Sequence, residues 1–140
     1  MKSAALAFLA LTCLGAGCSN STPAAPSTTS TATASPFFTG SLAPKSSSFY
    51  SFTLTQAGTV SVTLASLSFG PQNPAPATIV GLGFGTPVGT DCSLTTSLKT
   101  GAGLVAQINT GASTGIFCVD IFDVGNLSSP VDFVIRIVQP

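Results

Sequence analysis

Residues 48–64 constrain the fold more than any other stretch, because apolar and hydroxyl-bearing side chains alternate along them. The apolar positions are Tyr50, Phe52 and Leu54 in the first half and Val60, Val62 and Leu64 in the second. Side chains two residues apart point to the same face of a β-strand, so each half predicts a strand with one apolar face. The break around Gly58 predicts that the two strands form a β-hairpin. An apolar sheet face must be covered, so the rest of the chain is expected to supply a second layer.

Six further segments predict strands, most of them from the same alternation. They lie at residues 37–42, 78–85, 92–98, 104–108, 116–123 and 131–138. The core-facing residues of the last two are expected to be Phe117, Val119 and Ile121, then Phe133, Ile135 and Ile137, with Asp132 and Arg136 on the opposite face. Turn residues separate the segments, including residues 43–46 and 111–115, and no convincing helical period is present. The sequence therefore predicts an all-β antiparallel sandwich of seven to eight strands over residues 37–140.

The first 17 residues have the three parts of a secretory signal peptide. Lys2 supplies the positive charge, residues 4–14 form an apolar run of 11 residues, and residues 15–17 are small. Eleven helical residues span about 16 Å, roughly half a bilayer, so the run is too short to cross a membrane. The alternative is a buried N-terminal helix of the mature domain.

The residues around Cys18, L-G-A-G-C at 14–18, resemble the lipobox of bacterial lipoproteins. The resemblance implies cleavage before Cys18 and acylation of its thiol and new amino group. Gly15 departs from the pattern, since Leu is usual there, and ordinary signal cleavage nearby is the alternative. Several acyl chains would hold the protein durably on a membrane. The resemblance thus implies a lipid-anchored protein of the bacterial envelope, at the outer membrane or the cell surface.

Residues 18–36 predict a disordered linker between this cysteine and the folded domain. After Cys18 they contain only Ser, Thr, Ala, Pro and one Asn. Without a large apolar side chain, such a segment cannot repay the entropy cost of ordering. Its extended limit is roughly 60 Å, so it would hold the domain at a distance from the surface that bears the anchor.

Charged residues are scarce, and this scarcity excludes several classes of function. The chain has four basic and four acidic residues and no His. Nucleic-acid binding requires clustered Lys and Arg, so no nucleic-acid partner is expected. A Ser nucleophile needs a base, and Lys45 and Lys99 lie in predicted turns, where they would be solvated rather than desolvated. We therefore expect no catalytic residues and no enzyme activity.

Two of the four cysteines belong to the folded domain. Cys13 lies in the signal peptide and Cys18 is the acylation candidate, which leaves Cys92 and Cys118. Oxidation is expected in an exported domain, so these two are predicted to form a disulfide. The alternatives, a metal site or a nucleophilic thiol, would need His or further thiols.

Three further features carry competing interpretations. Asp91, Asp120, Asp123 and Asn126 are weak candidates for a calcium site, since a Cys92–Cys118 bond would bring Asp91 near Asp120. The alternative is that Asp123 caps its own turn.

Phe49 and Phe122 lie opposite the predicted core faces, so they either stack on sugar rings or belong to a secondary core. Gly81, Gly83 and Gly85 share one strand face, which indicates a bulge or close backbone approach, or else a shallow ligand groove.

Residues 37–140 also resemble the bacterial pre-peptidase C-terminal domain, a small jelly-roll β-sandwich found beside secreted peptidases. The likeness rests on the segments at 40–42, 50–54, 58–64 and 115–121 and on the closing strand. The acidic strand usual after the hairpin is replaced by T-I-V-G-L at 78–82, so the calcium role linked to that strand is not implied here. Our main hypothesis is a non-catalytic binding module held at the bacterial envelope, whose partner is a polysaccharide or another envelope protein. The alternative is a structural or assembly protein of the envelope.

Overall fold

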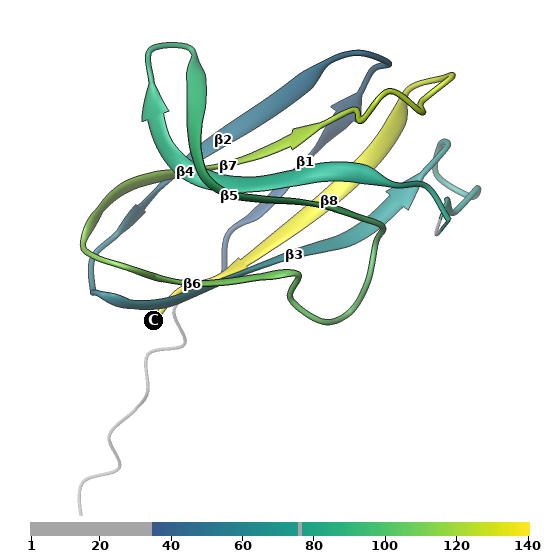
Figure 1. Ribbon diagram of the computed structural model, residues 1–140. Coiled ribbons are helices and arrows are strands. Elements are labelled where there is room, and N and C mark those ends of the chain that lie inside the picture. The colour runs from purple at the N-terminus through teal and green to yellow at the C-terminus, as the bar shows by residue number, and fades with distance from the viewer. Residues whose placement is uncertain (1–34, 76) are drawn as a thin grey trace, which may run out of the picture. The chain divides into compact units, whose positions relative to one another are not determined.

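The computed structural model describes residues 35–75 and 77–140, and these residues form eight β-strands. In chain order they are β1 (Phe37–Leu42), β2 (Ser47–Leu54), β3 (Gly58–Ser68), β4 (Val80–Val88), β5 (Asp91–Thr100), β6 (Ile108–Ala112), β7 (Gly115–Phe122) and β8 (Val131–Val138). Sheet 1 has the order β1-β8-β3-β6 and sheet 2 the order β2-β7-β4-β5 (Figure 1). All pairings are antiparallel, and one apolar core lies between the two sheets. The predicted all-β sandwich of seven to eight strands is confirmed.

The strand pairing shows that the chain is one long antiparallel hairpin rolled into a barrel-like sandwich. β1 pairs with β8, β2 with β7, β3 with β6 and β4 with β5. The bend lies between Val88 and Asp91, where Gly89 adopts a φ of 61° at the first position of a two-residue turn. Glycine accepts this backbone conformation without a Cβ clash. Successive strands alternate between the sheets except at the bend, where β4 and β5 are neighbours in sheet 2, and this is the jelly-roll arrangement.

The predicted hairpin at residues 48–64 is wrong. Both strands exist, but β2 lies in sheet 2 and β3 lies in sheet 1, so residues 55–57 connect the two layers. Alternation buries one face of each strand whether the two strands pair edge to edge or face each other across a core. Phe52 and Leu54 of sheet 2 and Val60 and Val62 of sheet 1 are therefore all buried in the one core, and the sequence pattern is the same in both cases.

The buried residues are those that the alternation predicts. The core contains Phe52, Leu54, Val60, Val62, Leu64, Val80, Leu82, Phe84, Val119, Ile121, Phe133, Ile135 and Ile137, with Phe117 partly buried against them. Phe38, Tyr50, Phe52, Phe84 and Phe117 extend this core as a chain of neighbouring aromatic rings. Since both inner faces are fully covered, only the outer faces and the loops are open to a ligand.

The segment at residues 104–108 is not the strand that its alternation predicts, and the turn predicted at 111–115 begins too early. β6 starts at Ile108 and continues through Gly111 and Ala112. Gly103 N–H donates to the Leu64 carbonyl at 2.9 Å and Gln107 N–H to the Val62 carbonyl at 3.0 Å. The residues between these two anchors bow away from the edge of sheet 1, which leaves Leu104 91 % exposed.

The first and last described residues lie together at one end of the sandwich. Ile137 N–H donates to the Pro36 carbonyl at 3.0 Å. The predicted signal peptide at 1–17, Cys18 and the linker up to residue 34 lie outside the described residues. Within 35–75 and 77–140, no helix is long and apolar enough to cross a membrane.

Candidate functional site

The outer face of sheet 2 is filled by its own neighbours, so the groove considered for the glycine strand face is absent there. A Cβ on Gly81 would fall on the Phe122 ring, and one on Gly83 would lie 2.6 Å from the Leu94 side chain. A Cβ on Gly85 would fall on the Ser93 carbonyl, beside a register shift in the β4–β5 pairing. The alternative interpretation, a bulge with close backbone approach, is confirmed.

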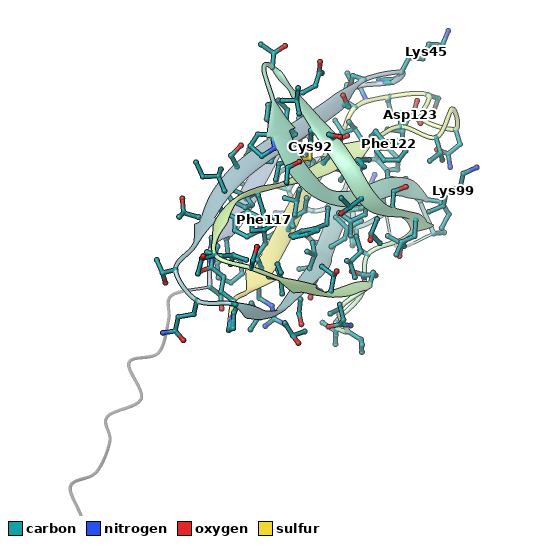
Figure 2. The ribbon with its side chains drawn as sticks, turned by 60° about the vertical axis from the view of Figure 1, so that its left-hand side comes forward. Lys45, Cys92, Lys99, Phe117, Phe122 and Asp123 are labelled. Carbon is teal, nitrogen blue, oxygen red and sulfur yellow. A yellow bond between two sulfur atoms is a disulfide. The ribbon has the colours of Figure 1, made fainter. Side chains whose placement is uncertain are left out.

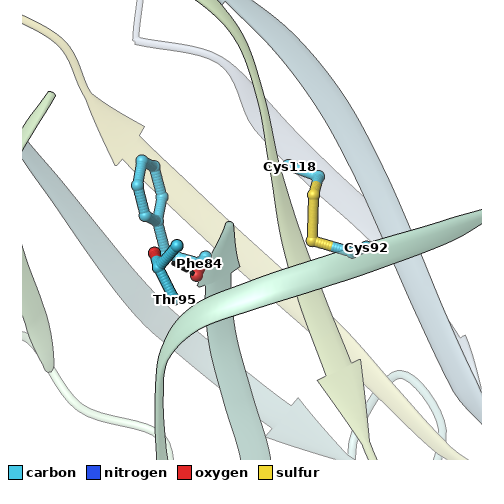
Figure 3. The surroundings of a disulfide bond; sticks show 4 residues. All are labelled: Phe84, Cys92, Thr95 and Cys118. Atoms are coloured by element: carbon cyan, nitrogen blue, oxygen red, sulfur yellow. Dashed lines mark hydrogen bonds between the residues drawn. A yellow bond between two sulfur atoms is a disulfide. The ribbon is translucent and has the colours of Figure 1, made fainter. Parts of the chain in front are cut away.

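The predicted Cys92–Cys118 disulfide is confirmed, with the two Cα atoms 6.0 Å apart. It joins β5 to β7 across β4, because Cys118 pairs with Gly85 and Cys92 with Pro87 (Figure 3). Next to it, Thr95 Oγ1 donates to the Phe84 carbonyl at 3.1 Å. The bond therefore holds β5 against the glycine-bearing face of β4.

Asp120 lies near Asp91 on the same sheet, as the disulfide predicts. Burial, then the charge of Asp91, raises the pKa of Asp120 from 3.8 to about 6. Its Oδ1 is buried and has no hydrogen-bond partner in the described part of the chain. The carboxyl therefore destabilises sheet 2 once it ionises.

Asp123 caps its own turn and also fixes the β1–β2 turn. Its Oδ2 accepts from Lys45 N–H at 2.7 Å, and its Oδ1 accepts from the N–H groups of Gly125, Asn126 and Leu127 at 2.8, 3.1 and 3.2 Å. The Lys45 bond is the largest cause of the lowered pKa of Asp123, and the other three bonds add to it. The turn-capping interpretation made from the sequence is confirmed.

The calcium site considered for Asp91, Asp120, Asp123 and Asn126 is not assembled. No group of three or more acidic, His or Cys residues gathers within 35–75 and 77–140. Asp123 lies beyond the end of β7 and its oxygens already accept backbone N–H groups, whereas Asp91 lies beside the disulfide. Asn126 contributes its backbone N–H to the turn.

Phe49 and Phe122 do not form the exposed stacking surface considered from the sequence. Both lie on the outer face of sheet 2, as expected, but both are half-buried. The Phe122 ring covers Gly81, and Phe49 pairs with Asp120. The alternative, a secondary core outside the sheet, describes the Phe122 ring (Figure 2).

Two hollows adjoin on the outer face of sheet 1. The Phe37 hollow, of about 220 Å³, is lined by Phe37, Thr63, Ala65, Gly103, Leu104 and Arg136. The Pro74 hollow, of about 230 Å³, is lined by Ala65, Ser66, Leu67, Pro74, Ala102, Gly103 and Leu104. The three shared residues make the two hollows neighbours along β3.

The Phe37 hollow has two apolar walls with a polar floor between them. Arg136 on β8 pairs with Phe37 on one side and with Thr63 on the other. The loop that follows β5 lies beyond β3, where Gly103 bonds to the backbone of β3 and Leu104 projects outward. Phe37, 62 % exposed, and Leu104, 91 % exposed, therefore flank Arg136 and Thr63.

Both polar side chains of this floor have unused hydrogen-bonding atoms. Arg136 Nε and Thr63 Oγ1 are buried, and neither has a hydrogen-bond partner among residues 35–75 and 77–140. A buried polar atom without a partner is costly, and each one in a native protein needs an explanation, such as strain, a catalytic role, or a water or ion that binds there. Of the six residues that line the hollow, only Arg136 is charged.

Sequence reasoning placed Arg136 on the outer face of its strand but did not connect it with a site. The signal was present, since Arg136 is one of only four basic residues and alternates with Phe133, Ile135 and Ile137. Its neighbours were not predictable, because Phe37 and Thr63 become adjacent only through the jelly-roll pairing. Leu104 was assigned to a strand.

Comparisons with known proteins add no relative. No family model matches the chain, and no curated protein matches it.

Proposed function

We propose that this protein is a non-catalytic binding module, tethered to the bacterial envelope, whose ligand is a polysaccharide or another envelope protein. The observation that carries the proposal is the Phe37 hollow, in which Arg136 Nε and Thr63 Oγ1 lack partners among the described residues. Two apolar walls around a few convergent polar groups are typical of binding sites. The resemblance to the pre-peptidase C-terminal domain agrees with such a role.

The composition of the hollow favours binding over catalysis. Arginine keeps its proton at physiological pH, and neither hollow is lined by an Asp, Lys or Tyr that could exchange one. The Asp91–Asp120 pair, which has the raised carboxyl pKa, belongs to sheet 2 and lines neither hollow.

Binding is tested with the full chain and two matched variants. Phe37→Ala and Ile116→Ala each remove a large apolar side chain of similar exposure, 62 % and 59 %, from sheets 1 and 2 respectively. Capture of envelope polysaccharides or proteins should be lost with Phe37→Ala and kept with Ile116→Ala. Equal capture by both variants and the wild type would exclude the outer face of sheet 1 as the binding site.

Attachment to the envelope is tested separately through Cys18. Acylated wild-type protein should enter the detergent phase on partitioning, because several buried acyl chains outweigh a small polar domain. Cys18→Ser should lose the lipid mass and remain in water or persist as an uncut precursor. If both proteins partition into water, the envelope tether is absent and only the binding role remains.

The second candidate function is a structural or assembly protein of the envelope. Its support is the exposure of Leu104 and Val105, 91 % and 79 %, next to the same hollow. Contiguous exposed apolar residues often mark contacts with other proteins. Sedimentation that shows concentration-dependent assembly without ligand, abolished by Leu104→Ser, would favour this candidate.

A further inference from the structure

The arrangement of the two hollows indicates a ligand with repeating units. They lie in sequence along β3, with Thr63 in the Phe37 hollow, Ala65 in both, and Ser66 and Leu67 in the Pro74 hollow. Each is smaller than the roughly 300–1,000 Å³ of sites for drug-sized molecules, so each suits one compact unit such as a sugar ring. A polymer could place successive units in the two hollows.

The charge of the Phe37 hollow indicates that one unit is acidic. Arg136 is the only charged residue among the six that line it, and its Nε lacks a partner among the described residues. A guanidinium presents its N–H groups as a planar fork that matches a carboxylate in a two-bond contact. A carboxylate above Arg136 would satisfy the Nε, and a neighbouring hydroxyl of the ligand could pair with Thr63 Oγ1.

The surroundings suit a sugar, which has apolar C–H faces and many hydroxyls. The ring of Phe37 and the side chain of Leu104 offer apolar contact on either side of the floor. Hydroxyls continue along the same face, with Thr39 on β1, Ser61 on β3 and Ser66 at the edge of the Pro74 hollow. Phe and Arg side chains of this kind contribute both orientation and contact area.

An extended peptide fits this position less well. Peptides that bind to sheets usually add as a strand at a free edge, where backbone groups are available. At the floor of the Phe37 hollow β8 has a paired strand on both sides, whereas β3 pairs with β8 on one side and with β6 only as far as Val62 on the other. Beyond Val62 the backbone of Leu64 is already occupied, because its N–H donates to the Gln107 side chain and its carbonyl accepts from Gly103 N–H. Recognition there depends on side chains, which favours a ligand without backbone amides to satisfy.

We propose that the outer face of sheet 1 binds an acidic polysaccharide, with a uronic acid carboxylate on Arg136 between Phe37 and Leu104 and the next sugar in the Pro74 hollow. This assignment rests on the proposed binding function and specifies its ligand class. Arg136 and Thr63 set the preference for the acidic unit, while Phe37 and Leu104 hold the sugar ring.

The experiment titrates the full chain with oligosaccharides of galacturonate, mannuronate, guluronate and glucuronate by calorimetry. Methyl-esterified oligogalacturonate is the matched control, because it keeps the sugar ring and removes the charge. We expect at least one uronate oligomer to bind and its methyl ester to bind at least tenfold more weakly. Arg136→Gln should weaken uronate binding at least tenfold and abolish the preference over the ester.

Two further variants separate contact from charge. Arg136→Lys keeps the charge but loses the planar fork, so its affinity should lie between those of the wild type and Arg136→Gln. Phe37→Ala should weaken the acid and its ester by the same factor. Thermal unfolding of each variant checks that the fold is retained, and Ile116→Ala should bind like the wild type.

The outcomes distinguish this inference from the proposed function. Equal binding of acid and ester, or an Arg136→Gln variant with unchanged affinity, would overturn the acidic ligand and leave a sugar-binding module. Capture of an envelope protein at the Phe37 hollow with no uronate binding would also overturn it and leave the binding function. If Phe37→Ala leaves binding unchanged and self-assembly is the only activity observed, both the acidic-polysaccharide inference and the proposed binding function are overturned.

Discussion

The outer faces of the two sheets differ in what covers them, although both sheets have four antiparallel strands. In sheet 2 the outer face is occupied by groups of the protein itself: the Phe122 ring over Gly81, Leu94 over Gly83 and the Ser93 carbonyl over Gly85. In sheet 1 the outer face has two adjoining hollows with Arg136 in one of them. The sandwich core requires only the inner faces, so one outer face can add stability while the other remains open to a ligand.

Loss of the disulfide should have the largest effect on stability. Replacing Cys92 and Cys118 together by Ala frees β5 from β7 across a sequence separation of 26 residues. The chain-entropy model gives a loss of about 3–4 kcal/mol in the free energy of unfolding. Urea denaturation of the oxidised wild type and the double variant measures it. A loss below about 1 kcal/mol would mean that sheet 2 holds β5 in place without the bond.

Gly85→Ala should be the next largest change, because the new methyl group would fall on the Ser93 backbone rather than on a flexible side chain. Overpacking of this kind costs about 1–3 kcal/mol. Gly111→Ala on β6 is the matched control, since a Cβ there meets nothing within 4 Å. If denaturation shows the two variants to be equally stable, the outer face of sheet 2 is looser than described.

Asp120→Asn should stabilise the protein at neutral pH. The folded-state pKa of about 6 lies above the ordinary 3.8, so the wild type loses stability as the pH rises through this interval. The variant has no such loss, and its advantage should be full above about pH 6 and absent below about pH 4. Denaturation as a function of pH gives the difference directly. An advantage that persists unchanged at low pH would attribute the effect to packing rather than to charge.

Phe37→Ala should have the smallest effect on stability. Phe37 is 62 % exposed and lies outside the core, so the change should remain within about 0.5 kcal/mol. The same variant should lose ligand binding. A large destabilisation in thermal unfolding would show that Phe37 supports sheet 1 and that its effect on binding is indirect.

Much of the fold could be predicted from the sequence, because alternation reports which side chains are buried. It identified the closing strand at 131–138 and the core positions Phe133, Ile135 and Ile137. Alternation does not report the partner of a strand. The connection that crosses from β2 in sheet 2 to β3 in sheet 1 was therefore predicted as a hairpin. The same limit hid the candidate site, whose residues come from β1, β3, β8 and a loop.

The glycine face illustrates a second limit. The spacing of Gly81, Gly83 and Gly85 indicated close approach of some group, and this is what the structure has. Which group approaches depends on β7 and β5, so the sequence could not decide between an internal contact and a ligand. Asp123 is the opposite case, because its partners Gly125, Asn126 and Leu127 are local and the turn was predictable.

We propose that sheet 1 is the open, ligand-binding face and that sheet 2 is closed by its own packing. The most direct measurement is a map of backbone amide chemical shifts of the full chain during titration with an oligouronate. We expect chemical-shift changes on β1, β3, β8 and residues 102–105, with β2, β4 and β7 unaffected. Changes centred on Phe49, Asp120 and Phe122 would contradict the proposal, because the ligand would then occupy the outer face of sheet 2.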